Sequence, residues 1–515
     1  MNALKDLLVP VLFGSLVATA SAQSLELKVV GGSLPGDIVM EAYPALYPFE
    51  LMMIVPSTSP GPTPIGLFDP ADPRSLSIGI DLLGFAWPVA ADFNLVASQQ
   101  VSFVASPVLI GQALFFQAVT FQWQPTILDR ISNGSVARFG NAGQFEDRSV
   151  FMYEQRAFST ALQRPDSTSL IVGGARGQLL AQIATATTEI YDPITDSFSY
   201  GPVMTSARSM HTMTELQNGT FLISGGVDVS NNPQASCEIY DPVANTFTMI
   251  ASMNTPRMGH TATVLANGNV FISGGLEALT VTPTQLEAIH DAVDSTEIYD
   301  PVANTWTVGP VMSDPRASHL ALERPDGKIL LCGGISWDSN WLFGWVPAVR
   351  SSCDLYDPVT NTMSAGPGMS TARALAGVVE MAPGRWLVAG GMDGISIIPL
   401  NLGNAVATAE IYDSQTNTWT TVGSLASARA QVSAWPIGNG RFIVAGGGAG
   451  SVLSPTPLSD TEIFDTATNT FSPGPTMNSG RAGAGVFVTP QGQVFMFGGA
   501  ATSSSITTTT EWYFF

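Results

Sequence analysis

Short alternating or apolar runs, each bounded by a turn signal, fill the chain from about residue 140 onward. In "HTATVLANGNVFISGG", residues 260–275, an alternating run leads through Asn-Gly into an apolar run that ends at a glycine pair. The next two runs are "STEIYD" and "NTWTVG", residues 295–300 and 304–309. This pattern predicts four short antiparallel strands joined by tight turns.

The link between the last two strands is "DPVAN", residues 300–304. Asp300 suits the first position of a turn, Pro301 presets its backbone angle, and Asn304 tolerates the left-handed region. Almost the same eleven residues occur twice, as "EIYDPVANTFT" at 238–248 and "EIYDPVANTWT" at 297–307. The four-strand unit is therefore part of a repeat.

Three markers recur in register seven times. The first is a glycine pair 49 to 59 residues from the next: Gly173-Gly174, Gly225-Gly226, Gly274-Gly275, Gly333-Gly334, Gly390-Gly391, Gly446-Gly447 and Gly498-Gly499. The second is an acidic residue: Glu189, Glu238, Glu297, Asp354, Glu410, Glu462 and Glu511. The third is an arginine four residues after Met or Leu: Arg156, Arg208, Arg257, Arg316, Arg373, Arg429 and Arg481.

Units of about 50 residues with four short strands each predict a β-propeller. The order of Gly-Gly, Tyr and Trp resembles the kelch repeat over roughly residues 140–515, although Phe or Met replaces the Trp in most units. We therefore expect an all-β protein with a seven-bladed kelch-type propeller at 138–515. The seventh unit reaches Phe515 after its third strand, so we expect a strand near 141–147, including Phe145, to complete it.

The first part of the chain lacks these markers. Residues 24–135 contain apolar and alternating runs between Pro- and Gly-rich turns, which favours a small antiparallel β domain resembling a sandwich. Before it, Lys5 precedes an apolar run and Ala20-Ser21-Ala22 offers small residues for cleavage. This pattern is typical of a signal peptide at 1–22, with an uncleaved anchor as the alternative. We expect a secreted or periplasmic protein without any other membrane span.

Composition limits the partners. The net charge is −21, and Lys5, Lys28 and Lys328 are the only lysines in the sequence. Such an electronegative chain repels phosphate backbones, so we expect no nucleic-acid partner.

The resemblance raises the question of a metal. Kelch-type propellers include galactose oxidase-like enzymes, whose copper is held by two His, two Tyr and a Cys cross-linked to one Tyr. Here His211, His260 and His319 each follow a repeat arginine by three residues, which indicates a packing role within the repeat. We expect no metal and no cofactor.

The arginines allow two interpretations. In protein-binding kelch propellers the matching arginine lies near the mouth of the central channel, where guanidinium groups would hold an anionic peptide or acidic sugar. Seven acidic residues recur with them, however, and one buried pair in each unit would be structural. We favour pairing for most of them and keep Arg316 and Arg373 as candidate ligand contacts.

One loop after a glycine pair stands out. The stretch "ISWDSNWLFGWVP" carries Trp337, Trp341 and Trp345. Exposed tryptophans on a binding face stack on sugars or anchor protein contacts, whereas folded-back tryptophans would cover the channel. This loop, with Arg316 or Arg373, is the candidate ligand site.

The chain has three cysteines. Cys332 precedes Gly333 on a second strand, and Cys353 precedes Asp354 on the third strand of the same unit. Neighbouring antiparallel strands could bring them within bridging distance, which would leave Cys237 free.

These features favour a protein- or carbohydrate-binding scaffold rather than an enzyme. The alternatives are a carbohydrate-active enzyme, which would need acid and base carboxylates that converge at the channel, and a surface or matrix protein without a consistent pocket.

The signal peptide gives a direct prediction. Export should be followed by cleavage before Gln23. N-terminal sequencing of the mature protein should therefore begin at Gln23, and a mature chain that still begins at Met1 would rule cleavage out.

Overall fold

The structure is a computed structural model. It describes residues 25–31, 33–34, 36–43, 51–64, 75–78, 86–90, 96–103, 109–110, 112–121, 128–131, 135–138, 140–147, 150–178, 181–278, 292–340, 344–397, 400–451, 455–488, 493–502 and 505–514. The predicted signal peptide and Trp341 lie outside these ranges. Every regular element within them is a β-strand, which confirms the all-β prediction for the described residues.

The chain divides into two compact units. The first comprises Met1–Lys28, Met40–Gln99 and Phe115–Ser135, and the second comprises Val29–Val39, Gln100–Leu114 and Val136–Phe515. Two short segments of the stretch 24–135 therefore group with the repeats rather than with the rest of that stretch.

The N-terminal strands form small, mainly antiparallel sheets. One has the order β1-β3-β8 and another the order β10-β9-β4-β7, with β11 also paired to β9. Met52 and Ile54 on β4 and Phe116 and Ala118 on β9 are buried. The strands are β1 (Glu26–Gly31), β2 (Ser33–Leu34), β3 (Gly36–Tyr43), β4 (Leu51–Ser57), β5 (Pro60–Pro64), β6 (Ser75–Ile78), β7 (Trp87–Ala90), β8 (Ala97–Phe103), β9 (Ala113–Phe121), β10 (Leu128–Ile131), β11 (Ser135–Arg138) and β12 (Gly140–Asn141).

The repeats form seven four-stranded antiparallel sheets within the described residues. The first sheet contains β14 (Thr160–Gln163), β15 (Ser169–Val172), β18 (Thr188–Asp192) and β19 (Ser197–Tyr200). The second contains β20 (Thr212–Glu215), β21 (Phe221–Ser224), β22 (Cys237–Asp241) and β23 (Thr246–Met249). The third contains β24 (Thr261–Val264), β25 (Val270–Ser273), β26 (Thr296–Asp300) and β27 (Thr305–Val308).

The remaining sheets follow the same order along the chain. The fourth contains β28 (Leu320–Glu323), β29 (Ile329–Cys332), β32 (Cys353–Asp357) and β33 (Thr362–Ala365). The fifth contains β34 (Gly377–Ala382), β35 (Arg385–Ala389), β38 (Ala409–Asp413) and β39 (Thr418–Thr421). The sixth contains β40 (Ser433–Pro436), β41 (Arg441–Ala445), β44 (Thr461–Asp465) and β45 (Thr470–Pro473). The seventh contains β46 (Gly485–Val488), β47 (Val494–Phe497), β50 (Thr510–Phe514) and β13 (Gln144–Asp147).

Two-stranded hairpins extend five of these sheets beyond the glycine pair, between their second and third strands. They are β16 (Ala175–Gln178) with β17 (Ala181–Ala184), β30 (Ile335–Asn340) with β31 (Gly344–Val349), β36 (Met392–Ile397) with β37 (Leu400–Ala405), β42 (Gly448–Ala449) with β43 (Thr456–Pro457), and β48 (Ala500–Thr502) with β49 (Ser505–Ile506).

The second strand of each sheet forms its core, because all four residues of strands such as β15, β21 and β25 are buried. The aromatic of the third strand packs on the large apolar residue opposite it on the fourth. Tyr299 is paired in register with Trp306, and their ring centroids are 4.8 Å apart. Where Phe or Met replaces the fourth-strand Trp, this large side chain makes the same contact with the third-strand aromatic residue.

The turn chemistry explains "DPVAN". The Asp300 carboxylate accepts hydrogen bonds from the backbone N–H groups of Val302 and Ala303, each 2.9 Å long. Asn304 has φ +52° and accepts a hydrogen bond from the Tyr299 hydroxyl. The tyrosine of the third strand therefore fixes the left-handed residue that lets the chain reverse.

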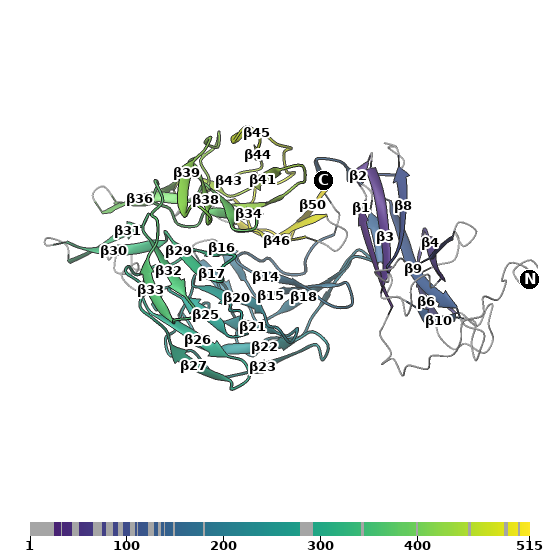
Figure 1. Cartoon of the computed structure of the whole chain (residues 1–515), viewed down its shortest axis with the longest axis horizontal. Helices are drawn as coiled ribbons and strands as arrows, with labels where there is room; N and C mark the ends of the chain where they lie inside the picture. Colours follow the sequence, from purple (N-terminus) through teal and green to yellow (C-terminus); the bar gives the residue numbers. More distant parts are fainter. Residues whose placement is uncertain are drawn as a thin grey trace, which may run out of the picture. The chain divides into compact units, whose positions relative to one another are not determined.

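The seventh sheet joins segments from the two ends of the repeat region. Strand β13 pairs antiparallel with β50, and Phe145 lies opposite Tyr513 at a ring distance of 5.0 Å. In Figure 1 the colours run from blue-green β14 through green β38 to yellow β46, which lies beside β14. Phe145 thus occupies the aromatic position of a fourth strand.

Replacing Phe145 tests the importance of this strand. Phe145 is buried against Trp435 and Tyr513, so Phe145→Ala should lower the free energy of unfolding by about 3–5 kcal/mol. The neighbouring Gln144 is exposed, and Gln144→Ala should change it by less than about 0.5 kcal/mol. Urea denaturation of both variants provides the measurement, and equal stability of the two would contradict a closing role for β13.

Candidate functional site

All seven repeat arginines are buried, with exposed fractions of 0% or 1%. Each precedes the first strand of its sheet, and its side chain donates a hydrogen bond to the carbonyl oxygen of the first glycine of the pair. A buried guanidinium is stable only when its donors are paired, so its contacts decide what the residue can do.

Arg208 shows the pattern. Its Nη1 donates to the carbonyl oxygens of Gly225 and Ser236 at 2.9 and 2.7 Å. Its Nη2 donates to the Ser236 hydroxyl and to the Glu238 carboxylate, at 3.0 and 3.1 Å. Glu238 in turn accepts backbone N–H groups from Thr205 and Ser206, which lie just ahead of Arg208. Both charges are thus fully hydrogen-bonded within the protein.

The same ion pair occurs in every sheet. The closest N–O distances are 3.0 Å for Arg156–Glu189, 3.1 Å for Arg208–Glu238, 3.1 Å for Arg257–Glu297, 2.8 Å for Arg316–Asp354, 2.8 Å for Arg373–Glu410, 3.1 Å for Arg429–Glu462 and 2.9 Å for Arg481–Glu511. Burial lowers the pKa of Arg373, and the hydrogen bond and charge of Glu410 oppose that shift.

The main chain of each arginine links neighbouring sheets. The carbonyl oxygen of Arg316 accepts a hydrogen bond from the backbone N–H of Gly275, at 2.7 Å. Gly274 beside it has φ +60°, and a Cβ there would collide with the Arg316 carbonyl. The equivalent bond from Gly499 to Arg156 joins the seventh sheet to the first. The glycine pairs are therefore required by the sheet junctions.

This geometry corrects the ligand role considered for Arg316 and Arg373. Neither guanidinium has exposed surface, and each is bonded to the carboxylate and carbonyl groups of its own sheet. A ligand at the surface cannot reach them without displacing a buried carboxylate. The expectation of an anionic ligand rested on these two residues and loses that support.

The sequence held one further signal of the pairing. Two residues before each acid stands a side chain that accepts from the arginine Nη2: Thr187, Ser236, Ser295, Ser352, Thr408, Asp460 and Thr509. This recurring polar residue marks a hydrogen-bonded interior position, and it could have settled the choice between pairing and ligand binding.

The three histidines are also buried. The Nε2 of His211 lies 2.9 Å from the Thr160 hydroxyl, and that of His260 lies 3.0 and 3.1 Å from the hydroxyls of Thr212 and Ser224. The Nε2 of His319 makes the same contacts with Thr261 and Ser273. Burial, together with a nearby arginine, lowers the pKa of all three from 6.5 to about 3. They are neutral packing groups, as their repeat position indicated.

The tryptophan-rich loop is the hairpin β30–β31. Trp337 is half-buried, and its indole N–H donates to the Ala292 carbonyl at 3.2 Å. Trp345 lies on β31 opposite Ser339, and its side chain, like the whole of Trp341, is outside the described residues. The loop therefore has one tryptophan anchored at its base.

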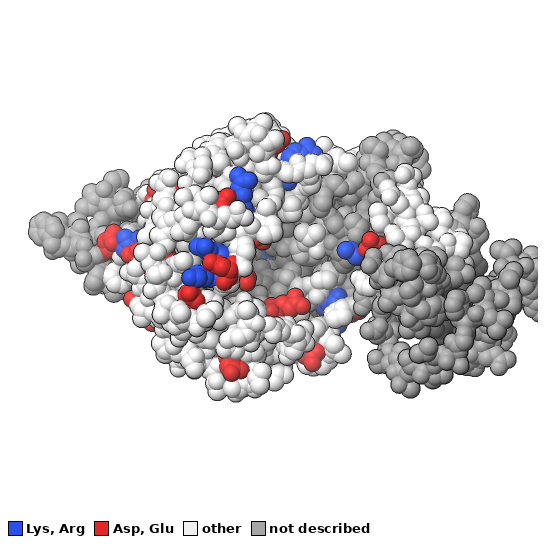
Figure 2. Space-filling model, in the orientation of Figure 1, with Lys and Arg blue, Asp and Glu red and all other residues white. Residues whose placement is uncertain are grey.

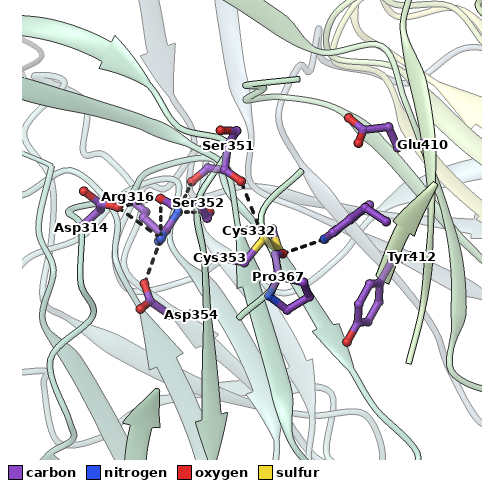
Figure 3. The surroundings of a disulfide bond; sticks show 12 residues. Asp314, Arg316, Cys332, Ser351, Ser352, Cys353, Asp354, Pro367, Glu410 and Tyr412 are labelled. Atoms are coloured by element: carbon purple, nitrogen blue, oxygen red, sulfur yellow. Dashed lines mark hydrogen bonds and ion pairs between the residues drawn. A yellow bond between two sulfur atoms is a disulfide. The ribbon is translucent and has the colours of Figure 1, made fainter. Parts of the chain in front are cut away.

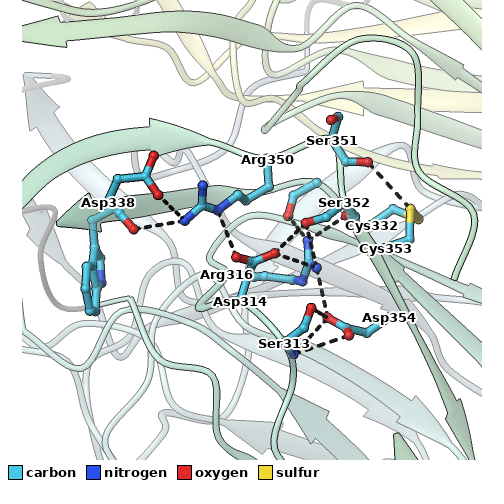
Figure 4. Close-up of polar contacts among 12 residues, drawn as sticks. Ser313, Asp314, Arg316, Cys332, Asp338, Arg350, Ser351, Ser352, Cys353 and Asp354 are labelled. Carbon is cyan, nitrogen blue, oxygen red and sulfur yellow. Dashed lines mark hydrogen bonds and ion pairs between the residues drawn. A yellow bond between two sulfur atoms is a disulfide. The ribbon is translucent and has the colours of Figure 1, made fainter. Parts of the chain in front are cut away.

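A chain of ion pairs holds the base of this hairpin (Figure 4). Arg350 on the return of the hairpin donates to Asp338 and to the Trp337 carbonyl, at 2.7 and 3.0 Å. Asp314 lies 3.3 Å from the Arg350 Nε and 3.7 Å from Arg316. Arg350 therefore connects the hairpin to the buried pair of the fourth sheet, and it is not a repeat residue that a sequence pattern could mark. Asp338 keeps 54% of its side chain exposed.

Cys332 and Cys353 form a disulfide in the same sheet, between β29 and β32 (Figure 3). They face each other in register with a Cα–Cα distance of 4.2 Å. Cys237 is a buried free thiol, and burial raises its pKa to about 11. A thiol of this kind is inert at neutral pH.

The surface in Figure 2 is mostly uncharged, and both acidic and basic side chains lie around the central hollow. Within the described ranges, no three His, Cys, Asp or Glu side chains converge to hold a metal ion. The part of the chain that the structure describes contains no helix long and apolar enough to cross a membrane.

Comparison with known proteins supports the kelch resemblance. A family model described as the kelch motif matches residues 207–254, 387–426 and 436–478. Two F-box/kelch-repeat proteins of Arabidopsis thaliana are 30% identical over 149 residues and 32% identical over 109 residues. These matches cover 28% and 21% of this chain, but only 32% and 28% of the two relatives.

A solved structure shares the fold. A fungal alcohol oxidase, determined in complex with copper, aligns with a TM-score of 0.54 and 16% identity, over 72% of this chain and 75% of its own. At this identity the likeness concerns the fold alone. Together with the kelch matches, it supports a kelch-type β-propeller.

The buried histidines predict acid sensitivity. Below pH 6.5 the unfolded chain binds protons at these residues, while the same histidines stay neutral in the folded chain down to about pH 3. The free energy of unfolding therefore decreases as the pH is lowered from 6.5 to 3. At pH 4.5 each buried histidine should lower the free energy of unfolding by about 2–3 kcal/mol relative to neutral pH.

His260→Gln removes one of these groups. Urea unfolding gives the free energy of unfolding at pH 7.5 and at pH 4.5. The decrease between the two pH values should be about 2–3 kcal/mol smaller in this variant than in the unmodified protein. The measurement at pH 7.5, where His260 is neutral in both states, separates this effect from lost packing. Parallel pH dependences of the two proteins would contradict burial as the cause.

Proposed function

We propose that the seven sheets are the blades of one closed kelch-type propeller, which acts as a binding scaffold for a protein partner. The observation that carries the proposal is that the hairpins all extend the sheets at the same position of the repeat, directly after the glycine pair. The residue after each glycine pair bridges the residue after an arginine, as in Ala157 with Ala175, Ala317 with Ile335 and Ala374 with Met392. The hairpins therefore leave the ring on the same face.

The most developed of them support a contact surface. Hairpins β30–β31 and β36–β37 have strands of six residues each, whereas β42–β43 has strands of two. The base of β30–β31 is fixed by the Asp338–Arg350–Asp314 chain, so the hairpin is held before any partner arrives. Preorganisation of this kind reduces the entropy lost on binding.

We propose that Trp341 and Trp345, from the stretch that forms β30–β31, supply the apolar anchor. Tryptophan is enriched among the residues that dominate binding energies at protein interfaces. Kelch repeats shared with the two plant F-box/kelch-repeat proteins are consistent with a protein partner.

Export, with residues 24–135 as a β accessory domain, belongs to the same proposal, and N-terminal sequencing of the mature chain tests the export.

A hairpin replacement tests the binding role. Asp338 and Val346 are opposite partners, so Asn-Gly in place of residues 339–345 closes the hairpin and removes both distal tryptophans. We expect peptides captured by the unmodified protein on an array to bind this variant at least about tenfold more weakly, since truncating a tryptophan anchor costs about 2 kcal/mol or more.

The matched control shortens the neighbouring hairpin. Ile395 and Leu402 are opposite partners on β36–β37, so Asn-Gly in place of residues 396–401 makes the same change there. The control should keep full affinity, and equal loss in both variants would remove the site from β30–β31. Capture of glycans but no peptides on parallel arrays would favour the carbohydrate-binding alternative, and capture of neither would favour a structural role.

A further inference from the structure

The position three residues after each repeat arginine differs around the ring. In the second, third and fourth sheets it is His211, His260 and His319. In the other four it is a small residue or valine: Ser159, Ala376, Val432 and Ala484. Because the backbone around this position is the same in every repeat, a smaller side chain in place of histidine fills less of the space beside it.

The histidines fill the space beside the preceding sheet. His260 reaches the hydroxyls of Thr212 and Ser224 on the second sheet. Its Cε1 would lie only 2.8 Å from a Cβ placed on Gly225, so the ring packs directly on the glycine pair. Alanine or serine at this position cannot extend so far and leaves the space empty.

A cavity lies where the small residues are. Its volume is about 590 Å³, and Ser159, Ala376, Val432 and Ala484 all line it. The rest of its wall comes from the first strands β14, β34, β40 and β46, with Met213 from β20, while β24 and β28 contribute nothing. The cavity is thus bounded mainly by the four sheets that lack the histidine.

The wall of the cavity is uncharged. Its side chains are apolar apart from Ser159, Thr160, Ser433 and the indole of Trp435. Val378 and Val488, which also line the cavity, are 38% and 50% exposed, so it is open to solvent.

We propose that this cavity binds an uncharged small molecule of one or two rings. The volume lies within the range of small-molecule sites, about 300–1,000 Å³. A charged ligand would lose its hydration without gaining a counter-charge, because no lining residue is ionisable.

A matched pair of dyes tests the ligand class. Phenylnaphthylamine is neutral, and anilinonaphthalene sulfonate has the same ring system with a negative charge. Fluorescence titration of the full chain should show one saturable site for the neutral dye and binding of the sulfonate that is weaker by at least about tenfold. Absence of saturable neutral-dye binding, or equal affinity for both dyes, would overturn the proposal.

A matched pair of variants tests the location. Ala434 is the second residue of β40 and lines the cavity, while Ala321 is the second residue of β28 and does not. Ala434→Leu adds three carbons to the cavity wall and should weaken neutral-dye binding by at least about tenfold, whereas Ala321→Leu should leave it within about twofold.

Equal effects of the two leucine variants would place the dye elsewhere. If Ala434→Leu fails to fold by circular dichroism, Ala484→Val applies the same test with a smaller side chain at another wall residue. The hairpin replacements at β30–β31 and β36–β37 should leave dye binding unchanged, so failure of the protein-binding proposal and failure of this one are distinguishable.

Discussion

The repeated buried bond between arginine and carboxylate organises the whole ring of sheets. Within one sheet, the guanidinium ties the third strand and the glycine pair to the segment that leads into the first strand. The carbonyl of the same arginine accepts the N–H of a glycine in the preceding sheet. One residue therefore fixes both the interior of its sheet and the junction to the next. Removing one partner of such a pair typically costs about 3–5 kcal/mol, because the other charge is left buried without compensation.

The hydrogen bond between a glycine N–H and the arginine carbonyl of the next sheet recurs at every junction, including the one between the last sheet and the first. The Gly499–Arg156 hydrogen bond joins the last junction in the same way as the six others, while β13 covers the edge of β50. An open ring would expose the backbone groups of an edge strand together with the aromatic face of Tyr513. The segments around residues 145 and 513 must therefore meet before the seventh sheet is complete, which makes this contact the one of longest sequence separation in the ring.

The sequence was informative wherever a residue type recurred in register. The glycine pairs, the third-strand acids and the "DPVAN" turns indicated the four-strand units, and the missing fourth strand indicated a closing segment near Phe145. It was less informative about Arg316 and Arg373, since a ring of arginines beside a ring of acids is compatible with pairing or with ligand binding until burial is known. Tertiary contacts such as the bond from Trp337 to Ala292 have no sequence signal, because they join non-repeated segments of two different sheets.

Positions that repeat in all seven sheets are explained by the fold, so differences between the sheets are where specific function can arise. Two such differences are clear in the described residues: hairpin length after the glycine pair, and the residue three places after the arginine. The first changes only the face of the ring, where additional length has little effect on the packed interior. The second changes the interior, where replacing an imidazole by Ala376 or Ala484 gives up packing contacts around a cavity. A cost of that kind persists more readily when the vacated space has an occupant, so the four sheets without histidine are where we expect a small-molecule ligand.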